Sequence, residues 1–480
     1  MKVLLIEPNI HDHALFPTIS LPSLKGYINT KTRHRAVVLD LVFHKKDWQQ
    51  VILDIIKQEQ PDLIGLTVLS FTYPDALLIA RFIKKHTTVP IIFGGVHAIL
   101  SPDDIICHHE VDMVCIGEGE EPLRELLDHS LHPKDVEGIW YKIDGKVVKN
   151  RPRTLVRNLD RLGVPDFEDF DLQKYFFINH GHLSIMASRG CPYMCTYCSN
   201  LALKKALKGQ YVRFRSVEHV MEEIGLRLEH YYGKGLRFLY FFDDTFILDK
   251  DYVLDFCQQF IKRGYHNKIR WTVNVRANLI TDELMKAMKQ AGCYQVRMGV
   301  ESGNEYIRNE VYHRNMTNQQ IFDAFSIIRK NGLELRLYFM IGAPDETNAM
   351  MKETLAMVKK SPTDDTLFGT LYPLPGTEIR KVCQEEQIIK QADDRELSYG
   401  VEAVTRTKYV SQPHLTRIIK KAKRWQIREY LRVGMRLSGP LLFFDCLTFL
   451  LYYRTKYDFQ LSEMLRWNVQ KYKLQRLTIQ

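Results

Sequence analysis

The sequence predicts an α/β protein with two successive parallel sheets and a mostly helical, basic C-terminal region. Residues 1–130 alternate apolar runs with amphipathic stretches, and residues 183–377 repeat this alternation six times. Strands that are apolar on both faces and separated by helices are typical of parallel sheets. Residues 411–480 hold 14 Lys and Arg against 4 Asp and Glu, so the net charge of +10 belongs to the end of the chain.

Residues 1–130 are predicted to form a doubly wound parallel sheet. The expected strands are 2–8, 36–41, 62–70, 89–95 and 111–119, and the clearest helices are 48–59 and 74–86. Ligands of such sheets bind beyond the carboxyl ends of the strands. The candidate binding residues at those ends are Ser70, Gly94, Gly95, His97, Gly117, Glu118 and Gly119. Glycines there allow close approach to a flat or phosphate-bearing ligand, whereas no GxGxxG follows the first strand, so a nicotinamide site is not expected.

Residues 131–182 are interpreted as a joint. A hairpin is expected over 139–150, with Asp144-Gly145 as its turn, because Asp-Gly between two apolar runs is a strong hairpin signal. A stretch rich in Pro and Asp follows at 162–171.

Residues 183–380 are predicted to form a partial (β/α)6 barrel. The expected strands are 183–189, 236–243, 269–276, 294–302, 334–342 and 366–373. The expected helices are 216–231, 249–263, 281–291, 317–331 and 347–360. Consecutive β/α units curve into a barrel whose chemistry lies at the carboxyl ends of the strands.

Three of the nine cysteines, Cys191, Cys195 and Cys198, crowd into the loop after the first barrel strand. Three is an odd number for disulfides, and structural zinc normally takes four protein ligands. His180 and His182 precede the strand and are expected at its opposite end. Soft thiolates select zinc, copper(I) or iron–sulfur, and a cubane held by three cysteines leaves one iron open to a substrate or cofactor.

The CxxxCxxC spacing, with the aromatic Tyr197 before the last cysteine, resembles the signature of the radical S-adenosylmethionine superfamily. The resemblance covers residues 183–380 and implies a [4Fe–4S] cluster. Its open iron binds the methionine group of S-adenosylmethionine, and an electron from the cluster cleaves that molecule to a 5′-deoxyadenosyl radical. Later strand ends resemble the binding segments of the superfamily. The implied binding residues are Tyr197, Asp243, Asp244, Arg276, Glu301 and Ser302.

These residues have distinct implied roles, and each has a plainer alternative. Asp243 and Asp244 are implied near the methionine amino group, and Arg276 near its carboxylate. Glu301 and Ser302 are implied near the ribose and methionine groups. An Asp pair can equally cap a helix, and an arginine can form a surface ion pair. Five such segments at successive strand ends are not explained by capping.

The stretch 90–126 resembles the cobalamin-binding domain that precedes the barrel in a large radical S-adenosylmethionine subfamily, and the resemblance covers residues 1–130. The DxHxxG motif that supplies a cobalt-ligating histidine elsewhere is absent. The resemblance therefore implies cobalamin bound without a protein histidine ligand, its nucleotide tail tucked into the sheet. A degenerate domain that has lost the cofactor is the alternative.

The subfamily implies methylation of an unactivated carbon. One S-adenosylmethionine methylates cobalamin, a second gives the 5′-deoxyadenosyl radical, and the substrate radical takes the methyl group from cobalt. Other relatives cyclise or oxidise their substrates without net methylation. A tRNA methylthiotransferase-like enzyme and a non-catalytic cobalamin or iron–sulfur sensor are further alternatives. The former carries a second cluster on three N-terminal cysteines, and this segment has only Cys107 and Cys115.

Residues 381–480 are expected to be helical and basic. Residues 414–431 place Leu415, Ile418, Ile419, Ala422 and Trp425 on one stripe, and an apolar run follows at 439–453 that is too short to span a bilayer. The first interpretation is a subdomain that caps the barrel, and the second is an interfacial element that meets anionic lipid.

Partners and location follow from these features. We expect a small-molecule or lipid-like substrate, an electron donor such as flavodoxin or ferredoxin, and no nucleic acid, because no RNA-binding module is recognisable. The first residues form a short strand-like run interrupted by Glu7 and Pro8 and do not resemble a signal peptide. Free cysteines fit a reducing compartment, so a cytoplasmic protein, peripheral to membranes if the tail meets lipid, is expected.

Overall fold

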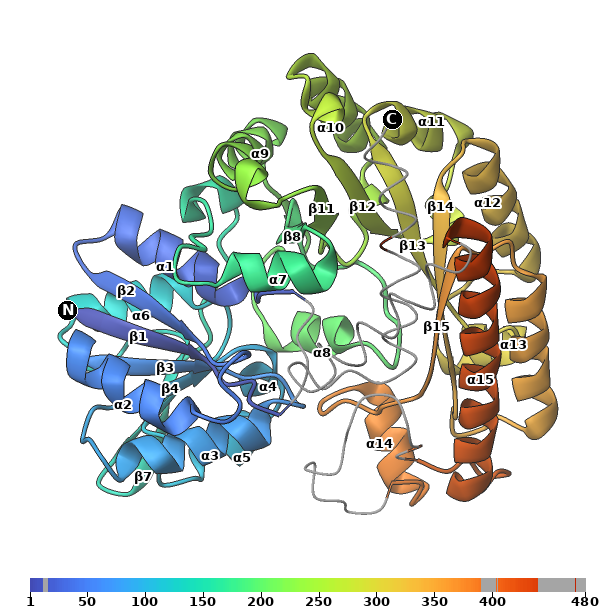
Figure 1. Ribbon diagram of the computed structural model, residues 1–480. Helices are drawn as coiled ribbons and strands as arrows, with labels where there is room; N and C mark the ends of the chain where they lie inside the picture. The colour runs from blue at the N-terminus through green and yellow to red at the C-terminus, as the bar shows by residue number, and fades with distance from the viewer. Residues whose placement is uncertain (12–15, 390–402, 404, 439–470, 472–480) are drawn as a thin grey trace.

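The computed structural model describes residues 1–11, 16–389, 403, 405–438 and 471. Two sheets lie side by side, with the joint residues between them (Figure 1). The predicted α/β class, with an N-terminal doubly wound sheet and a central partial barrel, is confirmed.

The first sheet has seven strands in the order β2-β1-β3-β4-β5-β6-β7. Its parallel part consists of β1 (Lys2–Glu7), β2 (Arg35–Asp40), β3 (Leu63–Thr67), β4 (Ile91–Gly94) and β5 (Met113–Cys115). All five expected strands form. From β1 the chain adds β2 on one side and then β3, β4 and β5 on the other. The loops that follow β1 and β3 therefore leave the sheet in opposite directions, and sheets of this kind bind their ligands in the crevice between two such loops.

Helices cover both faces of this sheet, as its apolar strands require. On one side lie α1 (Ser20–Lys31) and α6 (Glu120–Asp128), and on the other α2 (Trp48–Glu59), α3 (Tyr73–Lys84), α4 (Val96–Leu100) and α5 (Pro102–Ile106). The expected α2 and α3 are found. The second side has its own core, whereas the core on the α1 and α6 side continues into the rest of the molecule.

The expected hairpin forms from β6 (Ile139–Ile143) and β7 (Lys146–Lys149). Asp144 and Gly145 have φ values of 48° and 72°, as a two-residue hairpin turn requires. Its strands are not part of a separate joint, because β6 pairs antiparallel with β5 and extends the first sheet.

The remainder of the joint, η1 (Leu159–Leu162) and α7 (Leu172–Asn179), packs between the two sheets. The rings of Tyr175 and Phe43 lie 4.8 Å apart, and the Tyr175 hydroxyl donates to Asp40. Phe167 lies beneath the guanidinium of Arg227 at 4.8 Å. Buried side chains therefore form one continuous core from β1 through the joint into the barrel.

The second sheet has six parallel strands in the order β15-β14-β13-β12-β11-β8. The strands are β8 (His182–Ile185), β11 (Phe238–Phe241), β12 (Arg270–Val275), β13 (Cys293–Glu301), β14 (Glu334–Ile341) and β15 (Asp365–Thr370). The helices that cover its outer face are α9 (Val217–Tyr231), α10 (Lys250–Lys262), α11 (Asp282–Gln290), α12 (Asn318–Lys330) and α13 (Asn348–Lys360). The six predicted strands and five predicted helices are confirmed, and consecutive strands are neighbours.

The first barrel strand ends earlier than expected. After β8 the chain turns into β9 (Ser188–Arg189), which pairs antiparallel with β10 (Arg213–Phe214), and α8 (Ser199–Ala206) lies between them in sequence. The predicted strand 183–189 was too long because the backbone N–H groups of Ala187 and Ser188 bond to the Asp243 carboxylate and not to a neighbouring strand.

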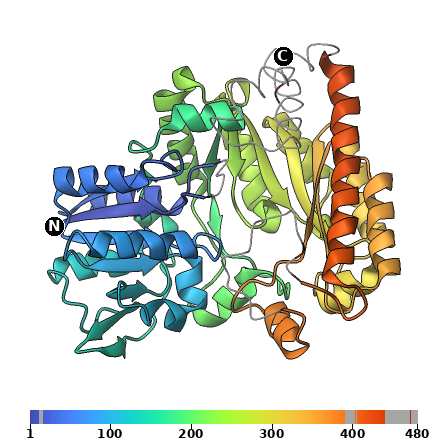
Figure 2. The ribbon, with the colours of Figure 1, turned by 60° about the horizontal axis from the view of Figure 1, so that its bottom comes forward.

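The C-terminal region begins with α14 (Glu378–Glu385) and continues in α15 (Gln412–Ser438), which runs along the outside of β15 (Figure 2). Leu415, Ile419 and Ala422 are buried, and Ile418 and Trp425 pack against the same core, so the predicted apolar stripe of this helix is confirmed. The apolar run 439–453 lies outside the described residues. Among the helices that the structure describes, none is both long enough and apolar enough to cross a bilayer.

Candidate active site

The three crowded cysteines line one cavity of about 220 Å³ at the carboxyl ends of the barrel strands. Cys195 is buried, and Cys191 and Cys198 are partly exposed. No three His, Cys, Asp or Glu side chains among the described residues lie close enough together to hold a single metal ion. Three thiols spread around a cavity, without a fourth protein ligand, fit a polynuclear iron–sulfur cluster better than a zinc ion.

Polar groups surround these thiols. Arg276 Nη1 lies 3.8 Å from Cys195 Sγ, and Asn200 Nδ2 lies 3.7 Å from Cys198 Sγ. The Arg276 guanidinium also stacks on the Tyr193 ring at 3.8 Å and donates to the Arg314 carbonyl. Hydrogen bonds to cluster sulfurs are one way in which a protein adjusts cluster potential. Arg276, one of the residues singled out from the sequence, lies on the wall of the thiol cavity.

Tyr197, Glu301 and Arg314 form a buried network in the same wall. The Tyr197 hydroxyl lies 3.1 Å from Glu301 Oε1 and accepts a hydrogen bond of 2.5 Å from Arg314 Nη1. Arg314 Nη1 also lies 3.3 Å from Glu301 Oε1. Burial raises the pKa of Glu301, although the Arg314 charge opposes the rise. The structure therefore brings Tyr197 and Glu301, two candidate residues from the sequence, together with Arg314.

The backbone of Glu301 has the left-handed φ value of 69°, at a register shift between β13 and β14. A side chain on Gly299 would place its Cβ 2.2 Å from Glu301 Oε1. Gly299 is therefore required for this carboxylate to turn into the cavity.

Two predicted residues do not line the thiol cavity. Asp243 is buried, and its carboxylate accepts from the backbone N–H groups of Ala187 and Ser188 and from the Ser188 hydroxyl. Burial raises its pKa to about 6 despite these bonds. Ser302 is fully buried and bonds to Thr354 Oγ1 at 3.2 Å. Ser302 therefore holds the scaffold, whereas Asp243 also lines the larger cavity described below, and the neighbouring Asp244 lines the thiol cavity.

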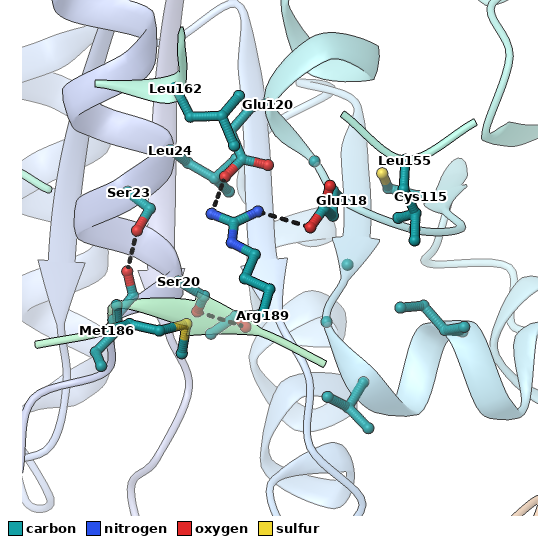
Figure 3. Close-up of a pocket in the computed structure, with 18 of the residues that line it drawn as sticks. Ser20, Ser23, Leu24, Cys115, Glu118, Glu120, Leu155, Leu162, Met186 and Arg189 are labelled. Atoms are coloured by element: carbon teal, nitrogen blue, oxygen red, sulfur yellow. Dashed lines mark hydrogen bonds and ion pairs between the residues drawn. The ribbon is translucent and has the colours of Figure 1, made fainter. Parts of the chain in front are cut away.

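A larger cavity of about 550 Å³ lies at the carboxyl edge of the first sheet (Figure 3). The predicted Gly94, Gly95, Gly117, Glu118 and Gly119 line it. From this edge the cavity extends along the sheet beneath α1. The deeper wall consists of Leu5, Leu21, Leu24, Gly65 and Ile92. A cavity of this size, lined by glycines at the strand ends and by apolar side chains between the sheet and α1, fits a large cofactor.

Ser70 and His97, the other two predicted residues of this sheet, are not in that wall. Both are buried, Ser70 Oγ lies 3.1 Å from His97 Nδ1, and the His97 ring packs on Tyr73 with centroids 4.5 Å apart. They brace the loops after β3 and β4.

The two cavities adjoin, because Asn200 and Asp244 line both of them. Asn200 accepts a hydrogen bond of 2.7 Å from the Tyr211 hydroxyl. Burial raises the pKa of Asp244. Asn200, Tyr211 and Arg314 are residues of the site that were not expected from the sequence. Only Asn200 carried a signal, since it lies two positions after Cys198.

Comparison with known proteins agrees with this architecture. The profile of the Radical SAM superfamily matches residues 185–358, and that of the B12 binding domain matches residues 13–127. The chain is 30% identical over 435 residues to the uncharacterized methyltransferase PH0819 of Pyrococcus horikoshii, covering 88% of this chain and 91% of that protein. It is 24% identical over 397 residues to the anaerobic magnesium-protoporphyrin IX monomethyl ester cyclase of Rubrivivax gelatinosus, covering 79% and 69% of the two chains.

Two solved structures share the fold. The cobalamin-dependent S-adenosylmethionine radical enzyme OxsB, with aqua-cobalamin and S-adenosylmethionine bound, superposes with a TM-score of 0.71 at 20% identity, over 99% of this chain and 80% of that one. The radical S-adenosylmethionine methyltransferase TsrM of Kitasatospora setae, with cobalamin and a [4Fe–4S] cluster bound, gives a TM-score of 0.69 at 19% identity, over 82% and 76%.

The fold and the two cavities define an iron–sulfur enzyme that holds a second cofactor in a domain of its own. The chain belongs to the radical S-adenosylmethionine superfamily and carries a B12-binding domain ahead of the barrel. It is an enzyme whose cofactors are a [4Fe–4S] cluster, S-adenosylmethionine and cobalamin.

Replacing Cys191, Cys195 or Cys198 with Ala is expected to lower bound iron and reductive cleavage of S-adenosylmethionine by more than about tenfold. Loss of a residue that only hydrogen-bonds to a metal ligand already lowers metal affinity or activity about tenfold or more, and these cysteines are the ligands themselves. Iron analysis and quantification of 5′-deoxyadenosine after anaerobic reconstitution measure both. Cys257→Ala is the control, since Cys257 is buried on α10 and does not line the cavity. Unchanged iron in all three variants contradicts the assignment.

Proposed function

We propose that the enzyme methylates an unactivated carbon of a small-molecule substrate. The observation that carries this proposal is the junction of the two cavities at Asn200 and Asp244. When bound, the cluster and S-adenosylmethionine supply a radical that removes hydrogen, and cobalamin supplies a methyl group. A substrate at the junction is within reach of both. The relatives PH0819 and TsrM, whose names describe methyltransferases, support this choice.

The chain's own residues orient and shield this chemistry. Arg276 and the network of Tyr197, Glu301 and Arg314 present a cation and a carboxylate to the thiol cavity, which suits the carboxylate and amino groups of a methionine moiety. Asp244 and Asn200 are the polar groups at the junction and would hold a donor on the substrate. The surrounding walls exclude water from a reactive radical.

Cyclisation or oxidation without net methylation is the second candidate, and the similarity to the Rubrivivax gelatinosus cyclase favours it. A methylthiotransferase is less well supported. Cys107 is exposed beyond α5 while Cys115 is buried in β5, so the N-terminal domain does not gather thiols for a second cluster. A non-catalytic sensor does not account for two adjoining cavities that share Asn200 and Asp244.

The two candidates differ in the fate of the S-adenosylmethionine methyl group. Reconstituted enzyme with cobalamin is incubated with reductant and S-adenosylmethionine that carries a trideuterated methyl group. A methyltransferase is expected to yield about one equivalent of S-adenosylhomocysteine per chain and to place the label on the corrinoid, as mass spectrometry detects. Formation of 5′-deoxyadenosine without any labelled corrinoid contradicts methylation and favours the cyclase class.

We further propose that cobalamin is held without a protein histidine ligand. Of the histidines near the strand ends of the first sheet, His97 is buried against Ser70 and Tyr73 and does not line the cavity. The electron paramagnetic resonance spectrum of the cobalt(II) form is expected to lack nitrogen superhyperfine splitting. A nitrogen triplet in the wild-type enzyme that disappears in His97→Ala refutes this.

A small acidic one-electron carrier, such as a flavodoxin or ferredoxin, is the proposed electron donor. Met194 within the cluster loop is 56% exposed, so the protein surface comes close to the cluster there. Lys204, Lys205 and Lys208 follow on and just after α8 and are exposed. An acidic carrier would meet complementary charge beside the cluster.

The tail supports a proposal of peripheral contact with anionic membranes and a lipid-like substrate. Arg417, Lys421 and Arg424 are exposed on the outer face of α15, whose apolar stripe is already packed against β15. Each basic residue near an anionic surface contributes about 1 kcal/mol of attraction, which fades with salt. The intact protein is expected to sediment with anionic but not neutral vesicles at low salt, and replacing the three residues with Gln should abolish sedimentation.

The matched control replaces three exposed lysines elsewhere, Lys57, Lys262 and Lys268, with Gln and should sediment like the wild type. If the intact protein ignores anionic vesicles even at low salt, α15 is only a cap on the barrel.

A further inference from the structure

The short strand β9 is held from both domains at once. It lies directly before the cluster loop, since Cys191 follows Arg189 by two positions. From the barrel side, the Asp243 carboxylate accepts from Ser188 N and Ser188 Oγ, both at 2.5 Å. From the first sheet, two carboxylates reach the guanidinium of Arg189 (Figure 3). A strand of two residues has little pairing of its own, so its position depends on these side chains.

The contacts with the first sheet form an ion-pair network around Glu118. Arg189 Nη1 lies 2.9 Å from Glu118 Oε1, and Arg189 Nη2 lies 2.7 Å from Glu120 Oε1. Arg213, the neighbour of Arg189 across the β9–β10 pair, donates to both Glu118 oxygens at 2.8 and 2.9 Å. Arg213 also donates to the Val156 carbonyl of the joint at 2.7 Å. Glu118 therefore bonds the loop after β5 to both strands that frame the cluster loop.

The network is screened from solvent. The side chains of Arg213 and Glu120 are only 3% and 5% exposed, and that of Glu118 is 17% exposed. Burial alone would raise the pKa of Glu118, but the hydrogen bonds and charges of Arg213 and Arg189 lower it overall. Charge-assisted bonds of this kind are geometrically specific, because a guanidinium binds carboxylates through fixed, paired N–H groups.

The same residues form the wall of the larger cavity. Glu118, Glu120, Arg189 and Arg213 all line it, together with Gly117 and Gly119. A cofactor in that cavity would therefore contact the loop after β5, whose Glu118 carboxylate is bonded to Arg189 of β9. Among the described residues, the ion pairs of Arg189 with Glu118 and Glu120 are the only ones that join β9 to the strand ends of the first sheet.

We propose that Glu118 is a positioning residue that fixes the distance and orientation between the cobalamin cavity and the cluster loop. It acts through Arg189 and Arg213 and does not line the cavity of the three cysteines. Removing its charge should leave both cofactors bound but let their separation vary.

The test is the magnetic interaction between cobalt(II) and the reduced cluster in the reconstituted holoenzyme, which reports their separation without any substrate. Wild type is expected to give one defined dipolar broadening and relaxation enhancement of the cobalt signal, and Glu118→Gln a distribution of weaker interactions. Iron and cobalamin contents should stay within about twofold of wild type. Asp103→Asn is the matched control, because its exposed ion pair with Lys149 lies within the first sheet and its helices.

Arg189→Lys is a second variant that preserves the charge. An ammonium cannot bond two carboxylates in the fixed geometry of a guanidinium, so intermediate broadening is expected. The same interaction in wild type and both variants overturns the proposal. Loss of cobalamin from Glu118→Gln with iron retained also overturns it, because Glu118 is then a cobalamin-binding residue and not a spacer.

Discussion

Parallel pairing is the constraint on which the rest of this structure depends. In a parallel sheet every strand ends at the same edge, so one edge collects the loops and the polar side chains. This chain builds two such sheets, and the joint turns them so that both edges border one interior space. Neither sheet forms a complete site alone, because the first contributes the glycines of the larger cavity and the loop after the first strand of the second carries the three cysteines.

The sequence was sufficient for the architecture and for those site residues whose role is local. Long apolar runs and amphipathic stretches predicted the parallel strands and barrel helices, because burial on both faces leaves an unmistakable pattern. The cysteine spacing predicted the cluster loop, since three thiols in one loop must lie near each other. Arg276 and Glu301, at the ends of strands, and Tyr197, in the cysteine loop, all line the thiol cavity.

Residues that depend on contacts between distant segments could not be predicted. Arg314 reaches Tyr197 across a sequence separation of 117 residues, and Arg213 reaches Glu118 across 95. Asp243 and Asp244 look alike in sequence, yet Asp243 bonds the backbone N–H groups of Ala187 and Ser188 and lines only the larger cavity, whereas Asp244 lines both cavities. Which of the two carboxylates bonds to the backbone is decided by where the neighbouring N–H groups point, and this is a property of the folded backbone.

The continuous core limits where domains of such enzymes can be exchanged. Tyr175 packs on Phe43 and Phe167 on Arg227, so the rings of the joint cover surfaces that belong to both halves. A chimaera made by exchanging residues 1–130 between relatives would expose these rings to mismatched partners, and exposed apolar patches favour aggregation. Viable crossovers must carry the joint along with the first sheet. The two cofactor-holding halves are therefore expected to be exchangeable only together with the joint that packs against both.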